Sequence, residues 1–205
     1  MDDSGRPAGG LGASDRLAAK SGSDLGVSDC LRVSRLGDAV RIEVSGLGNL
    51  RLAPTLRIFV ESELRAGTTN FVVDLANCRG MDSTFMGTFI GLSAEIKSRL
   101  GWFCLANVSP DNLRLLRMLG VLHLISVHDG RFPAPEEEAA VINPTNDPYA
   151  RQKQIREAHL LLMEADPVNR ERFGPFIQAL EAEMTGAPII IPPRAGGKAV
   201  PENGD

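Results

Sequence analysis

The chain has 205 residues with a formal net charge of −4, and 43% of its residues are hydrophobic. This length suits one principal domain with additional segments, and the acidic balance disfavours nucleic acid as a partner, because phosphate contacts need clustered Lys and Arg. The sequence contains no apolar run near the roughly 20 residues of a membrane span, and its first residues lack the apolar core of a signal peptide. We therefore expect a cytoplasmic protein with no direct membrane insertion.

The first part of the chain predicts a leader followed by a hairpin. Residues 1–28 are rich in Gly, Ser, Asp and Ala, and this composition predicts a disordered leader. Residues 31–36 and 39–44 read as two strands, because apolar side chains recur in both and Gly37-Asp38 between them is a turn signal.

The next part predicts a strand–helix–strand crossover behind a first helix. Residues 52–66 have helical periodicity, and an apolar run follows at 71–75. A second amphipathic helix is expected over 83–100 and a buried strand over 102–106. Such a crossover unit is almost always right-handed, with parallel strands. The apolar stripe of the second helix comprises Phe85, Phe89, Leu92, Ile96 and Leu100, widened by Met86 and Ile90.

A third helix and a last strand complete the predicted domain. Ser109-Pro110-Asp111 combines a capping hydroxyl, a first-turn proline and an acid that suits the helix dipole. This helix should stop at Gly120, and residues 124–127 are a plausible strand. The element order β-β-α-β-α-β-α-β predicts an α/β fold with a mixed sheet of four to five strands.

The rest of the chain changes in character. Residues 129–148 are rich in Pro and Glu and read as a linker, and 149–185 read as a helical extension of two helices. Pro175 is expected to break the second of these near its middle, and 186–205 are expected to be a disordered tail. The second helix carries an apolar face that must be covered, by the domain or by a partner: Phe173, Phe176, Ile177, Leu180 and Met184.

The start of the helix at 83 carries the most informative motif. A short strand, an exposed hydroxyl and a helix N-terminus place Ser83 where a phosphate is favoured by the helix dipole and the free backbone N–H groups. Asp, Ser and Thr are also the ordinary caps of helices, so the residue types alone leave a purely structural role open. The motif is Asp82-Ser83-Thr84-Phe85-Met86-Gly87.

This motif and the element order resemble the STAS domain, the fold of bacterial anti-sigma factor antagonists and of sulfate-transporter tails. The family pattern is Asp-Ser-Ser-Gly-Leu-Gly, in which the first Ser is phosphorylated, and Ser83 stands at that position. Phe85 replaces a frequent Gly, and Asn49 stands near a frequent Asp. The resemblance spans about residues 30–128, and it also takes in Asp74-Leu75, Gly101-Trp102 and Leu119-Gly120-Val121.

The resemblance implies a regulatory binding module, not an enzyme and without a cofactor of its own. Its implied partners are an anti-sigma factor serine kinase, which would phosphorylate Ser83, and a serine phosphatase, which would reverse the switch. The implied partner-binding residues surround the helix start, with Phe85 and Met86 expected to be partly exposed. They are Asn49, Asp82, Ser83, Thr84, Phe85 and Met86.

Other functions remain open from the sequence. A STAS module can be a non-phosphorylated scaffold, or an accessory subunit of a signalling complex or membrane transporter, and a small-molecule binder is a third possibility. Asp74 and Asp82 could also be read as a Mg²⁺-binding pair. A strand-end turn for Asp74 and a helix cap for Asp82 are the stronger interpretation, because no phosphate-cradling Gly-rich loop with Lys accompanies the two carboxylates. The three cysteines are far apart, and neither they nor the histidines have the spacing of metal ligands.

Overall fold

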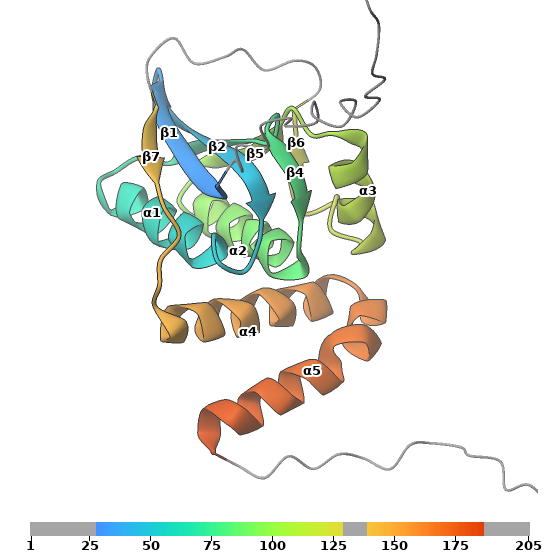
Figure 1. The fold of residues 1–205 in the computed structure, drawn as a ribbon. Coiled ribbons are helices and arrows are strands. Elements are labelled where there is room, and N and C mark those ends of the chain that lie inside the picture. Colours follow the sequence, from blue (N-terminus) through green and yellow to red (C-terminus); the bar gives the residue numbers. More distant parts are fainter. Residues whose placement is uncertain (1–27, 129–138, 187–205) are drawn as a thin grey trace, which may run out of the picture.

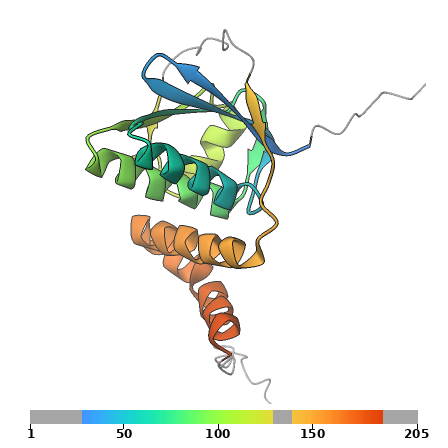
Figure 2. The same ribbon diagram turned by 90° about the vertical axis from the view of Figure 1, so that its left-hand side faces the viewer.

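The computed structural model describes residues 28–128 and 139–186 (Figure 1). The predicted disordered leader and tail fall almost entirely outside these residues, as does the first half of the predicted linker, residues 129–138. In the described part, a layer formed by a β-sheet is followed by a layer of two helices, and a further pair of helices lies beyond that layer (Figure 2). None of the described helices is long and apolar enough to cross a membrane.

The sheet is mixed, as predicted, but has more strands than the expected four to five. Residues 28–128 and 139–186 contain seven strands, in the order β6-β5-β3-β2-β1-β7, with β4 pairing beside β2. The β1 strand pairs antiparallel with β2 and β7, whereas the remaining neighbours are parallel. The strands are β1 (Cys30–Leu36), β2 (Ala39–Gly48), β3 (Asn70–Asp74), β4 (Cys78–Met81), β5 (Trp102–Ala106), β6 (Ser126–Val127) and β7 (Ala140–Ile142).

The two missed strands are short. The β4 strand spans four residues and contains Gly80, a residue depleted in strands. The β7 strand spans three residues and joins the edge of the sheet through β1. Neither sequence is long enough to display an alternating pattern, so pairing with a neighbouring strand decides its conformation.

The helices begin at the predicted positions. They are α1 (Ala53–Arg65), α2 (Ser83–Ser98), α3 (Pro110–Met118), α4 (Pro148–Ala165) and α5 (Pro167–Thr185). Asp82, Ser109, Asp147 and Asp166 each accept a backbone N–H bond at the start of a helix. The expected break at Pro175 is wrong, because α5 continues through this residue. A proline removes one backbone hydrogen bond, and the turns on either side retain theirs.

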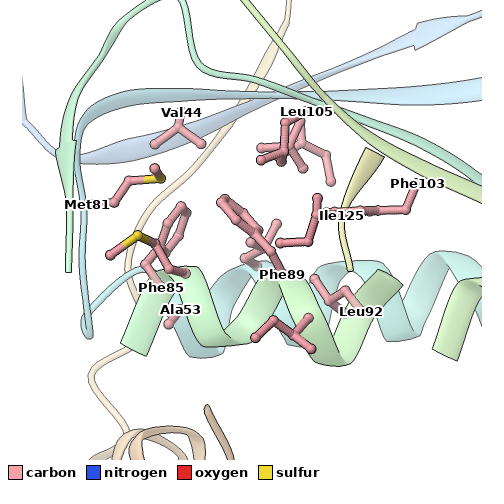
Figure 3. Packing of buried hydrophobic residues seen from close by; sticks show 14 of the residues in the cluster. Val44, Ala53, Met81, Phe85, Phe89, Leu92, Phe103, Leu105 and Ile125 are labelled. Atoms are coloured by element: carbon pink, nitrogen blue, oxygen red, sulfur yellow. The ribbon is translucent and has the colours of Figure 1, made fainter. Parts of the chain in front are cut away.

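The core lies between the sheet and the layer formed by α1 and α2 (Figure 3). Phe85 and Phe89 of α2 are fully buried, with ring centroids 5.0 Å apart in an edge-to-face arrangement. Phe103 of β5 lies 6.0 Å from Phe89. Burial of each large apolar side chain stabilises the fold by roughly 1.5–3 kcal/mol. The inward face of α2 is therefore firmly anchored, which fixes the position of its N-terminus and of its outward face.

The helical extension docks on the domain. The α4 helix contacts the outward face of α2, and α5 packs on α4 (Figures 1 and 2). Of the apolar face predicted for α5, Ile177 and Leu180 are buried. Phe176 and Met184 remain 46% and 37% exposed, so the covering of this face is incomplete.

Candidate functional site

The predicted phosphoacceptor lies at the first residue of α2, beside a cap that also holds a neighbouring loop. The Asp82 carboxylate accepts from the backbone N–H of Phe85 at 2.8 Å and from that of Leu50 at 2.7 Å. The backbone N–H of Asp82 donates to the carbonyl of Gly48 at 2.9 Å. Asp82 therefore ties the loop before α1 to the start of α2. Burial raises the pKa of its carboxyl, an effect opposed by these backbone donors.

Asn49 lies in that same loop, as the sequence predicted. Its Oδ1 accepts from the backbone N–H of Arg51 at 3.0 Å, and its Nδ2 donates to Asp29 Oδ2 at 2.9 Å. The structure thus brings Asn49, Asp82 and Ser83 to one end of the domain. In this conformation the Asn49 side chain is occupied by contacts within the chain.

Three of the predicted partner-binding residues are buried. Thr84, Phe85 and Met86 are 3%, 0% and 4% exposed, so the expectation that Phe85 and Met86 are partly exposed is wrong. The reason lies in Gly48, where an added Cβ would lie 2.5 Å from the Phe85 ring. This glycine allows the ring that replaces the family's frequent Gly to enter the core.

Two apolar side chains that the sequence analysis did not select are exposed at this end. Leu47 is 44% exposed and Leu50 is 36% exposed, and both flank the loop that Asp82 holds. The sequence feature that could have indicated them is the apolar residue on either side of Gly48-Asn49, next to the position that the resemblance assigns to partner binding. Exposed leucines on an ordered loop are suited to contact with another protein.

The structure adds a residue from the helical extension to the site. His159 of α4 lies with its Nε2 2.9 Å from Ser83 Oγ and its Nδ1 2.8 Å from the Ile155 carbonyl. A carbonyl only accepts, so Nδ1 carries a proton, and in the neutral imidazole Nε2 then accepts from the Ser83 hydroxyl. Burial lowers the pKa of His159, which favours this neutral form, although the Ile155 carbonyl and the Asp82 charge act in the opposite direction.

A second polar pair joins the same helices. Gln154 of α4 donates through Nε2 to Thr88 Oγ1 at 2.8 Å, and both side chains are buried. The Thr88 hydroxyl in turn donates to the Thr84 carbonyl at 2.8 Å. Neither Gln154 nor His159 had a sequence signal of its own, because each meets its partner only through the docking of α4.

The carboxylates considered as a metal-binding pair have separate structural roles. Asp74 forms a buried ion pair with Arg41 and also accepts from Asn107 Nδ2 at 2.9 Å. Asp82 is a helix cap. Among residues 28–128 and 139–186, no group of three or more His, Cys, Asp or Glu side chains is placed to hold a metal ion.

Comparison with known families assigns the central part of the chain. A family model described as "Mlab, STAS domain" matches residues 31–126. These residues therefore match the STAS domain, as the motif at Ser83 suggested. The match contains Asp82 and Ser83 and ends before the helical extension.

Solved structures similar to this chain include two anti-sigma factor antagonists. A putative antagonist from Thermotoga maritima is 20% identical with a TM-score of 0.46, and the match covers 49% of this chain and 86% of that one. The unphosphorylated antagonist SpoIIAA is 20% identical with a TM-score of 0.42, covering 49% and 88% of the two chains. The phosphorylated form of SpoIIAA, from Bacillus, is 18% identical with a TM-score of 0.41, covering 48% and 90%. A comparison with curated proteins finds no match.

Proposed function

We propose that the protein is an anti-sigma factor antagonist whose binding to its partner is controlled by phosphorylation of Ser83. The observation that carries this proposal is the position of Ser83 inside a STAS domain, at the start of α2 and directly after its cap Asp82. In the unphosphorylated form the protein binds a serine-kinase anti-sigma factor and so frees a sigma factor. The exposed Leu47 and Leu50, beside Asn49, provide an apolar contact at this end.

The chemistry of the switch requires only a hydroxyl from this chain. The kinase transfers the γ-phosphoryl group of ATP to Ser83 Oγ: the new O–P bond forms, the bond to ADP breaks, and a base of the kinase takes the hydroxyl proton. The phosphoserine adds about −1.5 to −2 charges, next to the carboxylate of Asp82. A partner that buries this end would have to desolvate that charge, so binding is lost until a serine phosphatase removes the phosphate.

Phosphate mapping with a matched pair of variants tests the proposal. The full chain is incubated with ATP and the kinase anti-sigma factor that copurifies with it, and the labelled residue is identified by mass spectrometry. Ser83→Ala should abolish labelling. Thr84→Ala is the control and should retain it, because the Thr84 side chain is 3% exposed. Full labelling of Ser83→Ala would exclude Ser83 as the acceptor.

A second candidate function is a non-phosphorylated scaffold, or an accessory subunit of a signalling complex or transporter. The observation in its favour is that the Ser83 hydroxyl already has a partner within the chain, His159. Ser83→Asp distinguishes the two functions, because an acid at the N-terminus of α2 is compatible with the fold of the domain over residues 31–126. A phosphorylation switch predicts weaker binding of the purified partner by this variant, whereas a scaffold predicts unchanged affinity.

A further inference from the structure

We propose that the helix pair α4–α5 is an autoinhibitory cover, which withholds Ser83 from kinase and partner until the pair moves off α2. The regulatory role of this cover rests on the proposed function of Ser83, whereas the occlusion of Ser83 by the helix pair does not. The STAS match ends at residue 126, so the cover is an addition to the domain that carries the motif. The occlusion of Ser83 depends on how closely α4 approaches α2 and on which atoms of α4 make the contact.

Two glycines on the outward face of α2 allow α4 to approach its backbone. At Gly87 an added Cβ would lie 2.5 Å from the Ala158 carbonyl oxygen and 2.8 Å from the Ala158 Cβ. At Gly91 it would lie 3.0 Å from Leu161 Cδ1 and 3.2 Å from Arg57 Nη1, which are the ends of flexible side chains. Ser83, Gly87 and Gly91 follow one another at helical spacing and so form a single stripe. The same stripe that accepts α4 therefore begins at the predicted phosphoacceptor.

Polar contacts from α4 complete the fit, and α5 supports one of them. His159 is bound to Ser83 and is 4% exposed, and its ring lies 4.8 Å from Phe173 and 5.1 Å from Phe176 of α5, between ring centroids. Gln154 is bound to Thr88 and is also 4% exposed. Both helices of the pair thus hold the imidazole against the Ser83 hydroxyl. Ser83 itself is only partly exposed.

This arrangement is incompatible with a phosphate on Ser83. A separation of 2.9 Å between Ser83 Oγ and His159 Nε2 is a direct hydrogen bond, with no room for a phosphoryl group between the two atoms. The phosphorylated residue would also place its charge beside the Asp82 carboxylate. The cover must therefore open before phosphorylation, and the phosphate then prevents it from closing in the same position.

The test uses one substitution at two glycines of the full-length chain. Gly87→Ala introduces a methyl group against the backbone of α4 and should undock it, whereas Gly91→Ala meets only side-chain ends that can move. Alanine favours a helix over glycine by about 1 kcal/mol, so neither variant should weaken α2 itself. Hydrogen exchange measures docking: amides of α4 should lose protection in Gly87→Ala and keep it in Gly91→Ala. If α4 stays protected in Gly87→Ala, Gly87→Leu repeats the test with a side chain too large to accommodate.

A chemical probe measures access to position 83 without any kinase. Ser83→Cys is combined with Cys104→Ser, because Cys30 and Cys78 are buried and Cys104 is not, and the reaction with DTNB is followed. The introduced thiol should react slowly, and Gly87→Ala should accelerate it at least about tenfold, which corresponds to about 1.4 kcal/mol of opening free energy. Gly91→Ala should leave the rate unchanged. Equal rates in all three backgrounds, with α4 shown to be undocked by exchange, would overturn the proposal.

Phosphorylation kinetics then separate this inference from the proposed function. With the copurifying kinase, Gly87→Ala should accelerate labelling of Ser83 relative to the parent chain and to Gly91→Ala. If the thiol probe reports gating but Ser83 is not labelled in any variant, the proposed function fails while the occlusion of position 83 stands. If labelling occurs at the same rate in the docked and undocked chains, the cover does not withhold Ser83 and the inference is wrong.

Discussion

The two faces of α2 are held by contacts of different chemistry. Its inward face buries Phe85 and Phe89 among the side chains of the sheet. Its outward face meets α4 through Gly87 and two hydrogen-bonded polar pairs, and α4 also contributes the fully buried Leu162 to the hydrophobic cluster. Apolar burial of the first kind contributes several kcal/mol and has no alternative partner in water. A hydrogen bond of the second kind contributes only about 0.5–1.5 kcal/mol, because water can replace it. The outward contact relies more on such hydrogen bonds than the inward one, so it is the more readily released of the two.

The largest expected effect comes from the inward face. Phe89→Ala removes a fully buried ring that contacts Phe85 and Phe103, and it should lower the free energy of unfolding by about 3–5 kcal/mol. Urea denaturation followed by circular dichroism measures this loss. Tyr149→Ala is the control, because this aromatic side chain is 68% exposed and its removal should change stability by less than about 0.5 kcal/mol. A small loss for Phe89→Ala would contradict the assignment of this face as the structural core.

The outward face should respond locally. Gln154→Ala removes a buried side chain bound to Thr88, and it should lower the free energy of α4 opening by about 1–3 kcal/mol. Hydrogen exchange should show faster exchange in α4 and α5 with little change in α2. Lys153→Ala, whose side chain is 62% exposed, is the control from the adjacent position. If Gln154→Ala accelerates exchange equally in α2 and α4, the two contacts form one cooperative unit and the distinction drawn here fails.

The inward face was predictable from the sequence, and the outward face was not. Phe89, Leu92 and Ile96 repeat at helical spacing, and Asp82 has the chemistry of a cap, so local rules predicted the start and the core positions of α2. The expectation for Leu100 in the same stripe is wrong, because α2 ends at Ser98 and Leu100 is 97% exposed. His159 meets Ser83 across 76 positions of sequence, and no periodicity encodes that distance. The signal available in the sequence was the pair Gly87 and Gly91. Glycine weakens a helix, so its presence inside α2 indicates a place where another part of the chain approaches closely.

The same reasoning explains the residues that were placed incorrectly. Their early position in the helix predicts that Phe85 and Met86 are partly exposed, but Gly48 on β2 admits the Phe85 ring to the core. The space that the Phe85 ring occupies is formed only when strand β2 and helix α2 pack together. Sequence rules that act within one element cannot anticipate such a cavity, although they placed Asn49, Asp82 and Ser83 correctly at one end of the domain.

Acid should weaken the outward contact, with a smaller effect than the loss of Gln154. The docked imidazole has its pKa lowered by burial below the ordinary 6.5, so the undocked state binds more protons as pH falls through that ordinary value. Linkage then favours undocking in acid. Protection of α4, corrected for intrinsic exchange, should decrease between about pH 7.5 and 5.5.

A variant of His159 tests whether the pH dependence of α4 protection comes from the imidazole or from a neighbouring group. Asp82 faces His159 from α2, and burial raises the pKa of its carboxyl, a shift that acts in the opposite sense to that of the imidazole. Phe173 and Phe176, which face the ring from α5, do not titrate. His159→Gln should therefore abolish or reverse the acid-induced loss of protection. Retention of the full loss in this variant would assign the effect to another group.

The smallest expected effect is a gain in the stability of the domain that leaves the docking of α4 unchanged. Leu100 follows the end of α2 with φ of 60°, a left-handed conformation that costs a residue with a Cβ about 1–2 kcal/mol. Its side chain is 97% exposed, so Leu100→Gly sacrifices almost no burial. Glycine relieves the strain but adds about 0.4–1 kcal/mol of unfolded-state entropy, which leaves a net gain of about 0.5–1 kcal/mol. Leu100→Ala is the control and should change little, because alanine retains the Cβ and the strain.

Denaturation should show the gain in global stability for Leu100→Gly. The free energy of α4 opening should stay unchanged, because position 100 lies at the opposite end of α2 from Ser83. A gain that appeared in α4 protection as well would mean that the end of α2 and its docked cover are energetically coupled.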